Sequence, residues 1–235
     1  MENMKGKKVL ITSGGCLEKW DEVRGHTNLS TGRMGKLLAE EALKTGASVI
    51  YLHGYFAEKP EAAHNLSSHS FEGIIDLQDK MKQIITSEKV DIVIMAAAGS
   101  DWVVDKIVDR EGNIIDKSGK LSSDMPPVIH FKKAPKVLAQ IKQWDPGVLL
   151  VGFKLESGIS QQELIMRAQI RMEGAQADFI VANASHALYT SETNHYIISK
   201  DSEVHVCTDK ANTAKSLICK LAMIHSEKEK VYSHY

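Results

Sequence analysis

Short hydrophobic runs alternate along this chain with longer segments in which hydrophobic positions recur every three or four residues. Four of the short runs, at 8–13, 47–54, 90–99 and 147–153, consist mostly of apolar residues. Such runs are typical of strands buried on both faces of a parallel sheet, whereas a half-exposed strand alternates apolar and polar residues. Because helical segments separate them, the pattern predicts an α/β fold with a doubly wound, mainly parallel, Rossmann-like sheet.

The longer segments have the spacing of amphipathic helices. The first helix is expected to begin at Ser30 or Thr31 and to end at about Thr45, because Gly46 follows its last apolar position. The same spacing predicts helices near 74–85, 135–144 and 160–174 and from Asp209 onward, with a further strand at 177–183. The segments 195–200 and 202–207 predict a late β-hairpin arm.

Residues 101–132 follow neither pattern, and we expect little regular structure there. A connection of this length in a compact domain is usually functional or mobile. We therefore interpret 101–132 as an active-site flap region within a single domain that spans residues 1–235.

The composition excludes several classes of protein. Lys plus Arg total 29 and Asp plus Glu total 30, which argues against nucleic acid as the main partner because such binders usually carry a basic excess. The three cysteines lack CxxC spacing, which argues against a zinc site or a disulfide scaffold. No signal peptide or stretch of membrane-spanning length stands out, so we expect a cytoplasmic protein.

Polar residues follow the first predicted strand, where an α/β sheet binds its ligands. Gly14 and Gly15 suit a tight turn, and STGRMG (30–35) opens a helix whose free N–H groups suit a phosphate. A plain strand-to-helix connection explains the glycines equally well. The density of polar groups in 12–36 favours a substrate cradle, and its members include Asp21, Arg24, His26 and Asn28.

Two later strands also end in candidate ligand residues. The small residues of AAAGSDW (96–102) leave space for a base or a sugar, and Asp101 is either a ligand of that group or a turn cap. Phe153 either stacks on a base or packs in the core. A flap lysine could neutralise a phosphate, and spacing does not choose among Lys106, Lys117 and Lys120.

Two other functions fit the fold. An NAD(P)-dependent oxidoreductase is opposed by the absence of GxGxxG after the first strand and of an acidic residue at the end of the second, IYLHG. A non-catalytic nucleotide-binding module stays open, although the polar loop disfavours it.

Six motifs in order resemble the phosphopantothenoylcysteine synthetase family, the ligases of coenzyme A biosynthesis. They are TSGG, TNLSTGRMG, AAAGSDW, KLSSD, KAPKVL and VGFKLE, and the similarity extends to about residue 183. Many bacteria fuse this domain behind a flavin-dependent decarboxylase. Because this chain begins at the synthetase itself, it resembles the stand-alone form, and no flavin is expected.

The resemblance implies a two-step amide synthesis. The 4′-phosphopantothenate carboxylate attacks the α-phosphate of a nucleotide, typically CTP in bacteria, which gives an acyl-nucleotidyl (acyl-cytidylate) intermediate and pyrophosphate. The amine of L-cysteine then displaces the nucleoside monophosphate. Mg²⁺ is expected to accompany the triphosphate, with protein ligands unknown, and the family's homodimers make 195–207 a candidate dimerisation hairpin.

The resemblance also implies roles for particular residues. Asn28 matches the residue that holds the intermediate, and Lys120 matches the flap lysine. The expected nucleotide-binding residues are Gly14, Gly15, Ala97, Asp101, Pro135, Lys136, Val137, Leu138 and Phe153. The expected substrate-binding residues are Asp21, Arg24, Ser30, Thr31 and Gly32.

The chain departs from the family pattern in three places. Cys16 replaces a threonine, and Gly99-Ser100 replaces Val-Ala, both exchanges among small residues. Two helix lysines after the GF motif are missing, with Arg167 and Arg171 as possible substitutes. Because Arg and Lys bind phosphates differently, the choice of CTP over ATP is less firmly implied than the reaction.

Overall fold

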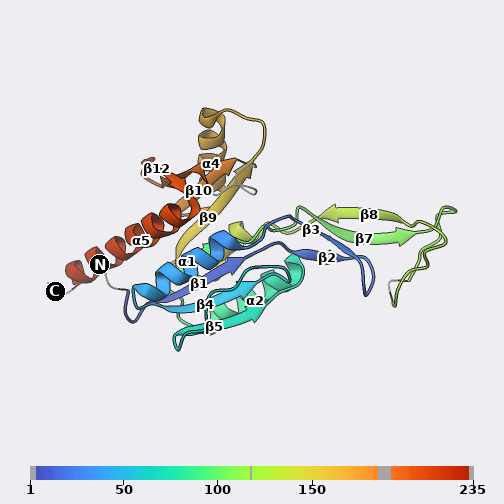
Figure 1. The fold of residues 1–235 in the computed structure, drawn as a ribbon, viewed down its shortest axis with the longest axis horizontal. Helices are drawn as coiled ribbons and strands as arrows, with labels where there is room; N and C mark the ends of the chain where they lie inside the picture. Colours follow the sequence, from blue (N-terminus) through green and yellow to red (C-terminus); the bar gives the residue numbers. More distant parts are fainter. Residues whose placement is uncertain (1–3, 117, 185–191, 233–235) are drawn as a thin grey trace.

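The computed structural model describes residues 4–116, 118–184 and 192–232 (Figure 1). Its centre is a sheet in which eight strands of this described chain lie in the order β12-β11-β10-β9-β6-β1-β4-β5. The strands from β10 to β5 run parallel, and β11 is antiparallel to both of its neighbours. The predicted doubly wound, mainly parallel sheet is confirmed. The strands are β1 (Lys8–Ser13), β4 (Ser48–His53), β5 (Leu66–Ser70), β6 (Ile92–Met95), β9 (Leu149–Glu156), β10 (Phe179–Ala184), β11 (Glu192–Ser199) and β12 (Val204–Asp209).

Helices cover both faces of the sheet. One hydrophobic core holds α1 (Arg33–Lys44) and α5 (Lys210–Tyr232) against one face. A second core packs α2 (Ile74–Ser87), the 3₁₀ turn η1 (Val137–Gln140), α3 (Ile141–Trp144) and α4 (Gln161–Ala175) against the other. The central strands are therefore buried on both sides, which explains their continuous apolar sequence.

The strand order reverses between β1 and β6. From β1 the chain continues to β4 on one side, and β6 later pairs with the other side of β1. Just beyond the strand ends, the Ala98 N–H donates to the Gly14 carbonyl at 2.8 Å, and the Cys16 N–H donates to the Ala98 carbonyl at 3.2 Å. Two loops are thus joined at the topological switch point, where α/β sheets bind ligands.

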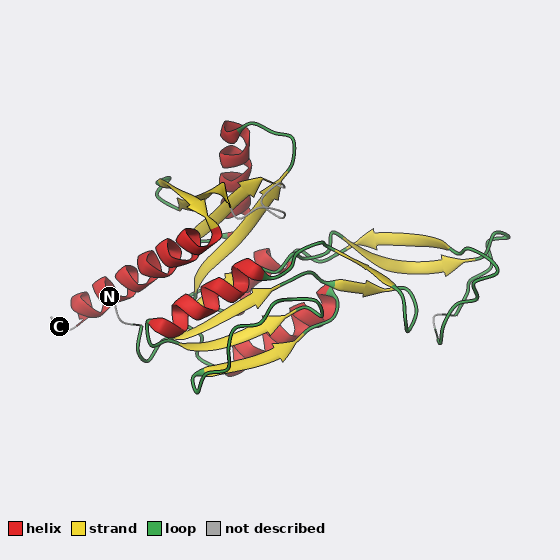
Figure 2. Cartoon of the chain, in the orientation of Figure 1, coloured by secondary structure: helices red, strands yellow, loops and turns green. Residues whose placement is uncertain are grey.

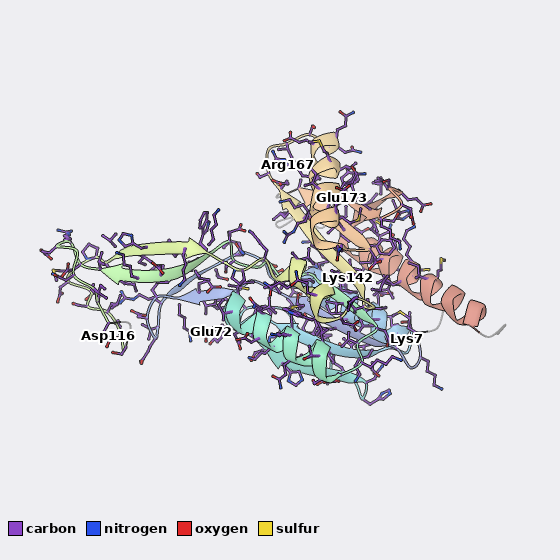
Figure 3. The ribbon with its side chains drawn as sticks, turned by 180° about the vertical axis from the view of Figure 1, so that it is seen from behind. Lys7, Glu72, Asp116, Lys142, Arg167 and Glu173 are labelled. Atoms are coloured by element: carbon purple, nitrogen blue, oxygen red, sulfur yellow. The ribbon has the colours of Figure 1, made fainter. Side chains whose placement is uncertain are left out.

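Lys142 of α3 fixes the second layer of helices to the sheet (Figure 3). Its ammonium donates to the Val148 carbonyl at 2.6 Å and to Asp178 Oδ2 at 2.8 Å. The same carboxylate oxygen accepts from the Leu150 N–H at 2.8 Å. These half-buried bonds set the position of η1, which directly precedes α3.

The prediction of little regular structure at 101–132 is wrong. The segment contains β7 (Trp102–Val108) and β8 (Val128–Lys133), which form an antiparallel ribbon that stands away from the sheet (Figures 1 and 2). A second small ribbon pairs β2 (Leu17–Lys19) with β3 (Gly25–Thr27). The sequence does not predict these strands because charged and exposed residues interrupt their hydrophobic pattern. Each strand is instead ordered by its hydrogen bonds to the neighbouring strand.

The predicted late hairpin exists, but its first strand belongs to the main sheet. Strand β11 pairs with β10 from Phe179↔Ser199 to Asn183↔His195, and β12 forms the outer edge. The ends of other elements also differ. Helix α1 begins at Arg33 after Gly32 in the left-handed region (φ 77°), and β9 continues to Glu156, so that Phe153 lies within the strand.

Glu18 connects the loop after β1 to both neighbouring loops. Its Oε1 accepts from the Ile74 N–H at 2.8 Å and from the Ser100 hydroxyl at 2.7 Å, and the side chain is buried. An anionic carboxylate at the start of α2 also interacts favourably with the helix dipole. Glu18 thereby holds the AAAGSD turn in place from outside it.

We expect Glu18→Ala to lower the free energy of unfolding by about 1–3 kcal/mol, because a buried N–H and a hydroxyl lose their acceptor. Glu22→Ala, at an exposed position nearby, is the control and should change stability by no more than about 0.5 kcal/mol. Urea denaturation of the two variants measures the difference. Equal stability of the two variants would contradict the role of Glu18.

Candidate functional site

A cavity of about 620 Å³ lies at the carboxyl edge of the sheet, at the switch point. Its walls come from the loop into α1, the start of α2, the turn after β6, the approach to η1, the end of β9, Arg171 of α4 and the β10–β11–α5 region. The lining includes Asn28, Arg33, Ala97, Asp101, Lys136, Phe153, Arg171, Asn183, His195 and Lys210.

Most of the predicted site residues converge on this cavity. Those that line it are Asn28, Ser30, Thr31, Gly32, Ala97, Asp101, Pro135, Lys136, Val137, Leu138 and Phe153. Those outside it are Gly14, Gly15, Asp21, Arg24 and Lys120. The motifs are therefore brought together in space as strand ends of a parallel sheet require.

Asn28 bridges the loop into α1 and the turn after β6. Its side-chain amide donates to the carbonyls of Ala98 and Gly99, each at 3.1 Å. With both amide hydrogens used in this way, its carbonyl oxygen is left for other partners. Asn28 thus fixes the two loops relative to each other at the cavity wall.

Gly14 and Gly15 shape the site from behind rather than line it. Gly14 has φ +82°, and a Cβ there would lie 2.6 Å from the Cβ of Ala57. A Cβ on Gly15 would lie 2.9 Å from Thr27 Oγ1 and would also meet the backbone of Asn28. The glycines are needed because the backbone of three segments meets here.

The nucleotide residues predicted at the cavity mouth contact each other. The Lys136 ammonium donates to Asp101 Oδ1 at 2.6 Å, and both side chains are exposed. An exposed ion pair contributes little stability, so a ligand can exchange with either partner at low cost. Phe153 is half-buried, packs against the core beside α1 and α5, and also lines the cavity.

The cavity lining is strongly cationic. Among the described lining residues, the only carboxylate is Asp101, and the cationic side chains are Arg33, Lys136, Lys154, Arg171 and Lys210. The chain as a whole has a formal charge of −1, so the positive charge is concentrated here. Such a cavity suits a ligand with several negative charges.

Only one of the two candidate arginines reaches the cavity. Arg171 lines it, whereas Arg167, labelled on α4 in Figure 3, forms ion pairs with Glu156 (3.3 Å) and Glu163. Hydrogen bonding to Lys154, followed by Arg167, lowers the pKa of Glu156 despite its partial burial. Arg171 is therefore the arginine with access to a ligand.

Sequence reasoning missed three residues at the far end of the cavity, Asn183, His195 and Lys210. His195 is almost completely buried, at 1% exposure. Burial, together with the positive charge of Lys210, lowers the pKa of His195 to about 4. The sequence nevertheless contains an indication of His195. In the strand TNHYIIS, side chains alternate between the two faces, so His195 shares a buried face with Ile197, and a polar residue on a buried face indicates a specific role.

Cys16, which departs from the family pattern, is a buried thiol. Burial raises the pKa of Cys16 to about 12, with the nearby Glu18 carboxylate adding to the effect. At neutral pH the side chain is a neutral, small core group rather than a nucleophile.

No group of three His, Cys, Asp or Glu side chains that could hold a metal occurs within 4–116, 118–184 and 192–232. No helix in the same part of the chain has the length and apolarity to cross a membrane.

Comparison with known proteins identifies the family. The model of the family described as DNA/pantothenate metabolism flavoprotein C-terminal domain matches residues 4–224. The chain belongs to this family. The resemblance inferred from the six motifs is therefore confirmed at the level of the family.

Curated relatives from two archaeal genera are similar to the chain. It is 33% identical over 200 residues to the coenzyme A biosynthesis bifunctional protein CoaBC of Thermococcus kodakarensis, a match that covers 85% of this chain and 47% of that protein. The CoaBC protein of Methanocaldococcus jannaschii is 32% identical over 199 residues, covering 83% and 45%. The chain spans about half the length of these curated relatives.

A solved structure in the same family has closely similar architecture. The DNA/pantothenate metabolism flavoprotein from Streptococcus pneumoniae superimposes with a TM-score of 0.85 at 28% identity, over 94% of this chain and all of that chain. The two structures therefore share the overall fold.

In this family member, Asp21 lies outside the cavity and joins the β2–β3 turn to the segment around Leu121. Its carboxylate accepts from the N–H groups of Val23 (2.9 Å), Arg24 (2.7 Å) and Leu121 (3.0 Å), and the Arg24 guanidinium bridges it to the Leu121 carbonyl at 2.6 Å. Glu22 donates its N–H to the Gly119 carbonyl at 3.2 Å. Lys120 is exposed between these two anchored positions, and Lys117 lies outside the described residues.

Burial opposes the charge on Asp21, but the hydrogen bonds from Leu121, Val23 and Arg24 outweigh it and hold the pKa well below the ordinary value of 3.8. A depressed folded-state pKa contributes stability at pH values above the unfolded-state pKa, and this contribution is lost as the pH falls below it.

We expect Asp21→Asn to be less stable than the wild type by a constant amount between pH 5 and pH 8. Below about pH 4 the difference should shrink, because the wild type then protonates Asp21 on unfolding. Urea denaturation across this pH range measures the difference. A difference in unfolding free energy that does not change with pH would show that the charge of Asp21 does not contribute to stability.

Proposed function

We propose that the chain is a ligase that joins 4′-phosphopantothenate and L-cysteine through an acyl-nucleotidyl intermediate, in coenzyme A biosynthesis. Membership of the family and the CoaBC names of its relatives support this function. The observation that carries it is the convergence on one cationic cavity of Asn28, Asp101, Lys136 and Phe153, from four separate motifs. An NAD(P)-dependent oxidoreductase is not favoured, because the residues that converge belong to the motifs of the synthetase family and GxGxxG is absent after the first strand.

The proposed chemistry converts a carboxylate into an electrophile. A carboxylate oxygen of phosphopantothenate bonds to the α-phosphorus while the bond from that phosphorus to the bridging oxygen of pyrophosphate breaks. The cysteine nitrogen then bonds to the acyl carbon, the carbon–oxygen bond to the phosphate breaks, and the nitrogen loses a proton. The cationic lining lowers the repulsion between two anionic substrates, and the cavity aligns them.

We propose CTP as the nucleotide, with Phe153 and the turn at Ala97 beside its base and sugar and residues 135–138 beside its triphosphate. Mg²⁺ bound to the triphosphate would screen its charge, and Asp101 is the lining carboxylate available to it. We also propose a cytoplasmic location, where the thiols of Cys16, Cys207 and Cys219 stay reduced.

We further propose that the protein works as a homodimer. Lys120 does not line the cavity of its own chain, and the ribbon that leads to it stands away from the sheet (Figure 1). Trp102, Val128 and Phe131 are exposed on this ribbon, which is a short two-stranded element of low intrinsic stability. A second copy would cover these residues and receive Lys120. The hairpin at 195–207 remains a second candidate interface.

A panel of nucleoside triphosphates, assayed with phosphopantothenate and cysteine for pyrophosphate release, tests the reaction. Release with CTP, dependent on phosphopantothenate, is the expected result. Absence of release with every nucleotide, together with nucleotide binding, would support a non-catalytic binding module instead.

We expect Asn28→Asp to abolish turnover while circular dichroism shows the wild-type fold. A carboxylate cannot donate to the Ala98 and Gly99 carbonyls, and its charge repels the anionic substrates, with like charges at short range costing several kcal/mol. Steady-state pyrophosphate release measures the effect. Full turnover in this variant would remove Asn28 from the site.

We expect Lys120→Gln to slow the chemical steps by about 10²–10³, because it removes a charge that strengthens binding in the transition state. Lys106→Gln, another exposed lysine of the ribbon, is the matched control and should keep the wild-type rate. Single-turnover kinetics compares the two variants, and equal rates would contradict the role of Lys120.

The same variants test the homodimer. If Lys120 serves the cavity of the partner, mixing inactive Asn28→Asp and Lys120→Gln proteins should restore part of the activity, because one mixed site has both wild-type residues. Absence of restoration after subunit exchange would place Lys120 in the cavity of its own chain.

A further inference from the structure

Three neighbouring strands present a row of side chains at the inner end of the cavity. Leu155 of β9 is opposite Asn183 of β10, which is opposite His195 of β11. Residues in register on adjacent strands share a face, and the hydrogen bond from His195 to α5 shows that this is the face covered by α1 and α5. All three side chains line the cavity.

The hydrogen bonds of Thr213 determine which nitrogen of His195 carries the proton. Thr213 Oγ1 donates its single hydrogen to the Asp209 carbonyl at 2.6 Å, as a helical threonine commonly does. Toward His195 Nδ1, at 2.9 Å, the hydroxyl must therefore accept. The proton of the neutral imidazole is on Nδ1, and Nε2 has a free lone pair.

Nε2 of His195 has no hydrogen-bond partner within the described chain although it is fully buried. A buried polar atom without a partner is rare and costs free energy. Because His195 lines the cavity, a ligand there is the partner that such an acceptor lacks. It would recognise an N–H or O–H donor.

Two cations line the same cavity as this acceptor. Lys210, the first residue of α5, and Arg33, the first residue of α1, both line the cavity. Burial and the charge of Arg33 lower the pKa of Lys210, and the Glu58 carboxylate opposes this only in part. Helix α1 has no acidic residue in its first turn and no side-chain cap, so its N–H groups add to the positive potential.

We propose that this corner is the binding site for the amino acid substrate, with its α-carboxylate between Arg33 and Lys210 and its amine donating to His195 Nε2. The inference rests on the proposed function, which supplies L-cysteine as the ligand. An α-amino acid places an anion and a donor on adjacent carbons, which matches the adjacent cations and acceptor.

The arrangement also suits the reaction. The amine attacks only as the neutral species, and two neighbouring cations disfavour the ammonium form. An acceptor at Nε2 orients the N–H so that the nitrogen lone pair faces the acyl carbon. Phosphopantothenate also offers an anion and a hydroxyl donor, so it is the other ligand that could occupy this corner. The experiments below distinguish cysteine from phosphopantothenate as the ligand.

Cysteamine has the amine and the thiol of cysteine but lacks the carboxylate, so it tests the two cations. For Lys210→Met we expect kcat/KM with cysteine to fall about 10- to 100-fold, the usual effect of losing a charged hydrogen bond, and kcat/KM with cysteamine to stay nearly constant. Lys215→Met, on an exposed position of the same helix, is the control and should keep the wild-type ratio. The ratio of the kcat/KM values for cysteine and cysteamine, measured on one preparation of a variant, does not depend on the fraction of that variant that is folded.

Two substitutions of His195 test the acceptor. Asn places its amide nitrogen near Nδ1 and keeps the bond to Thr213 but has no acceptor at Nε2, whereas Gln reaches the position of Nε2. We expect His195→Asn to slow the step that consumes cysteine by about tenfold or more and His195→Gln to recover part of the rate. Pyrophosphate release in a single turnover without cysteine should be unchanged in both variants.

Three results would overturn the proposal: an equal loss with cysteine and cysteamine in Lys210→Met, a raised KM for phosphopantothenate in that variant, or a wild-type rate of the cysteine step in His195→Asn. The first two would assign the cations to the phosphate of the other substrate. If the wild type releases no pyrophosphate with any nucleotide, the proposed function fails instead, which distinguishes the two failures.

Discussion

The close contact between the loops after β1 and β6 is the constraint on which the site depends. The Ala98 N–H donates to the Gly14 carbonyl at 2.8 Å, and Asn28 donates to the same turn. A side chain at Gly15 would push Thr27 and Asn28 away. The contact holds the loop that leads into α1 against the turn that leads to Asp101, and residues of both segments line the cavity.

The sequence predicts those parts of the fold that follow from burial. Central strands such as β1 and β6 are apolar because helices cover both faces, and a pattern search finds them. The ribbons and β5, whose sequence LSSHS is mostly exposed, derive their order from neighbouring strands. The hydrophobic periodicity of a segment carries no information about strands that pair with it from elsewhere in the sequence. For this reason the prediction at 101–132 was wrong.

The same distinction applies to the site. Asn28, Asp101 and Phe153 could be found because each belongs to a motif near a strand end. Asp21 and Leu121 are 100 residues apart, and no local pattern predicts that one carboxylate anchors the other segment. The alternation of β11 indicates a polar residue on a buried face at His195, but no local pattern predicts its hydrogen bond to Thr213 of α5.

The near-zero net charge likewise conceals the character of the cavity. An average over 29 basic and 30 acidic residues excludes a uniformly basic protein, but it says nothing of where the cations gather. Some acidic residues form exposed ion pairs away from the cavity, such as Glu88 with Lys8 and Asp76 with Lys80. Within the described lining, five lysines and arginines accompany one carboxylate, Asp101, and this local imbalance suits a polyanionic ligand.

The cavity walls extend along the chain from Asn28 to Lys210, which has a consequence for synthesis on the ribosome. A chain grows at about 5–20 residues per second, and the parallel strands from β1 to β10 emerge before β12 and α5, which follow each other directly at Asp209 and Lys210. Until Lys210 and Thr213 leave the ribosome, the inner end of the cavity lacks one wall and His195 lacks its fixed tautomer. The nascent protein therefore passes through a period in which residues 28–155 of the cavity lining have been synthesised and Lys210 has not.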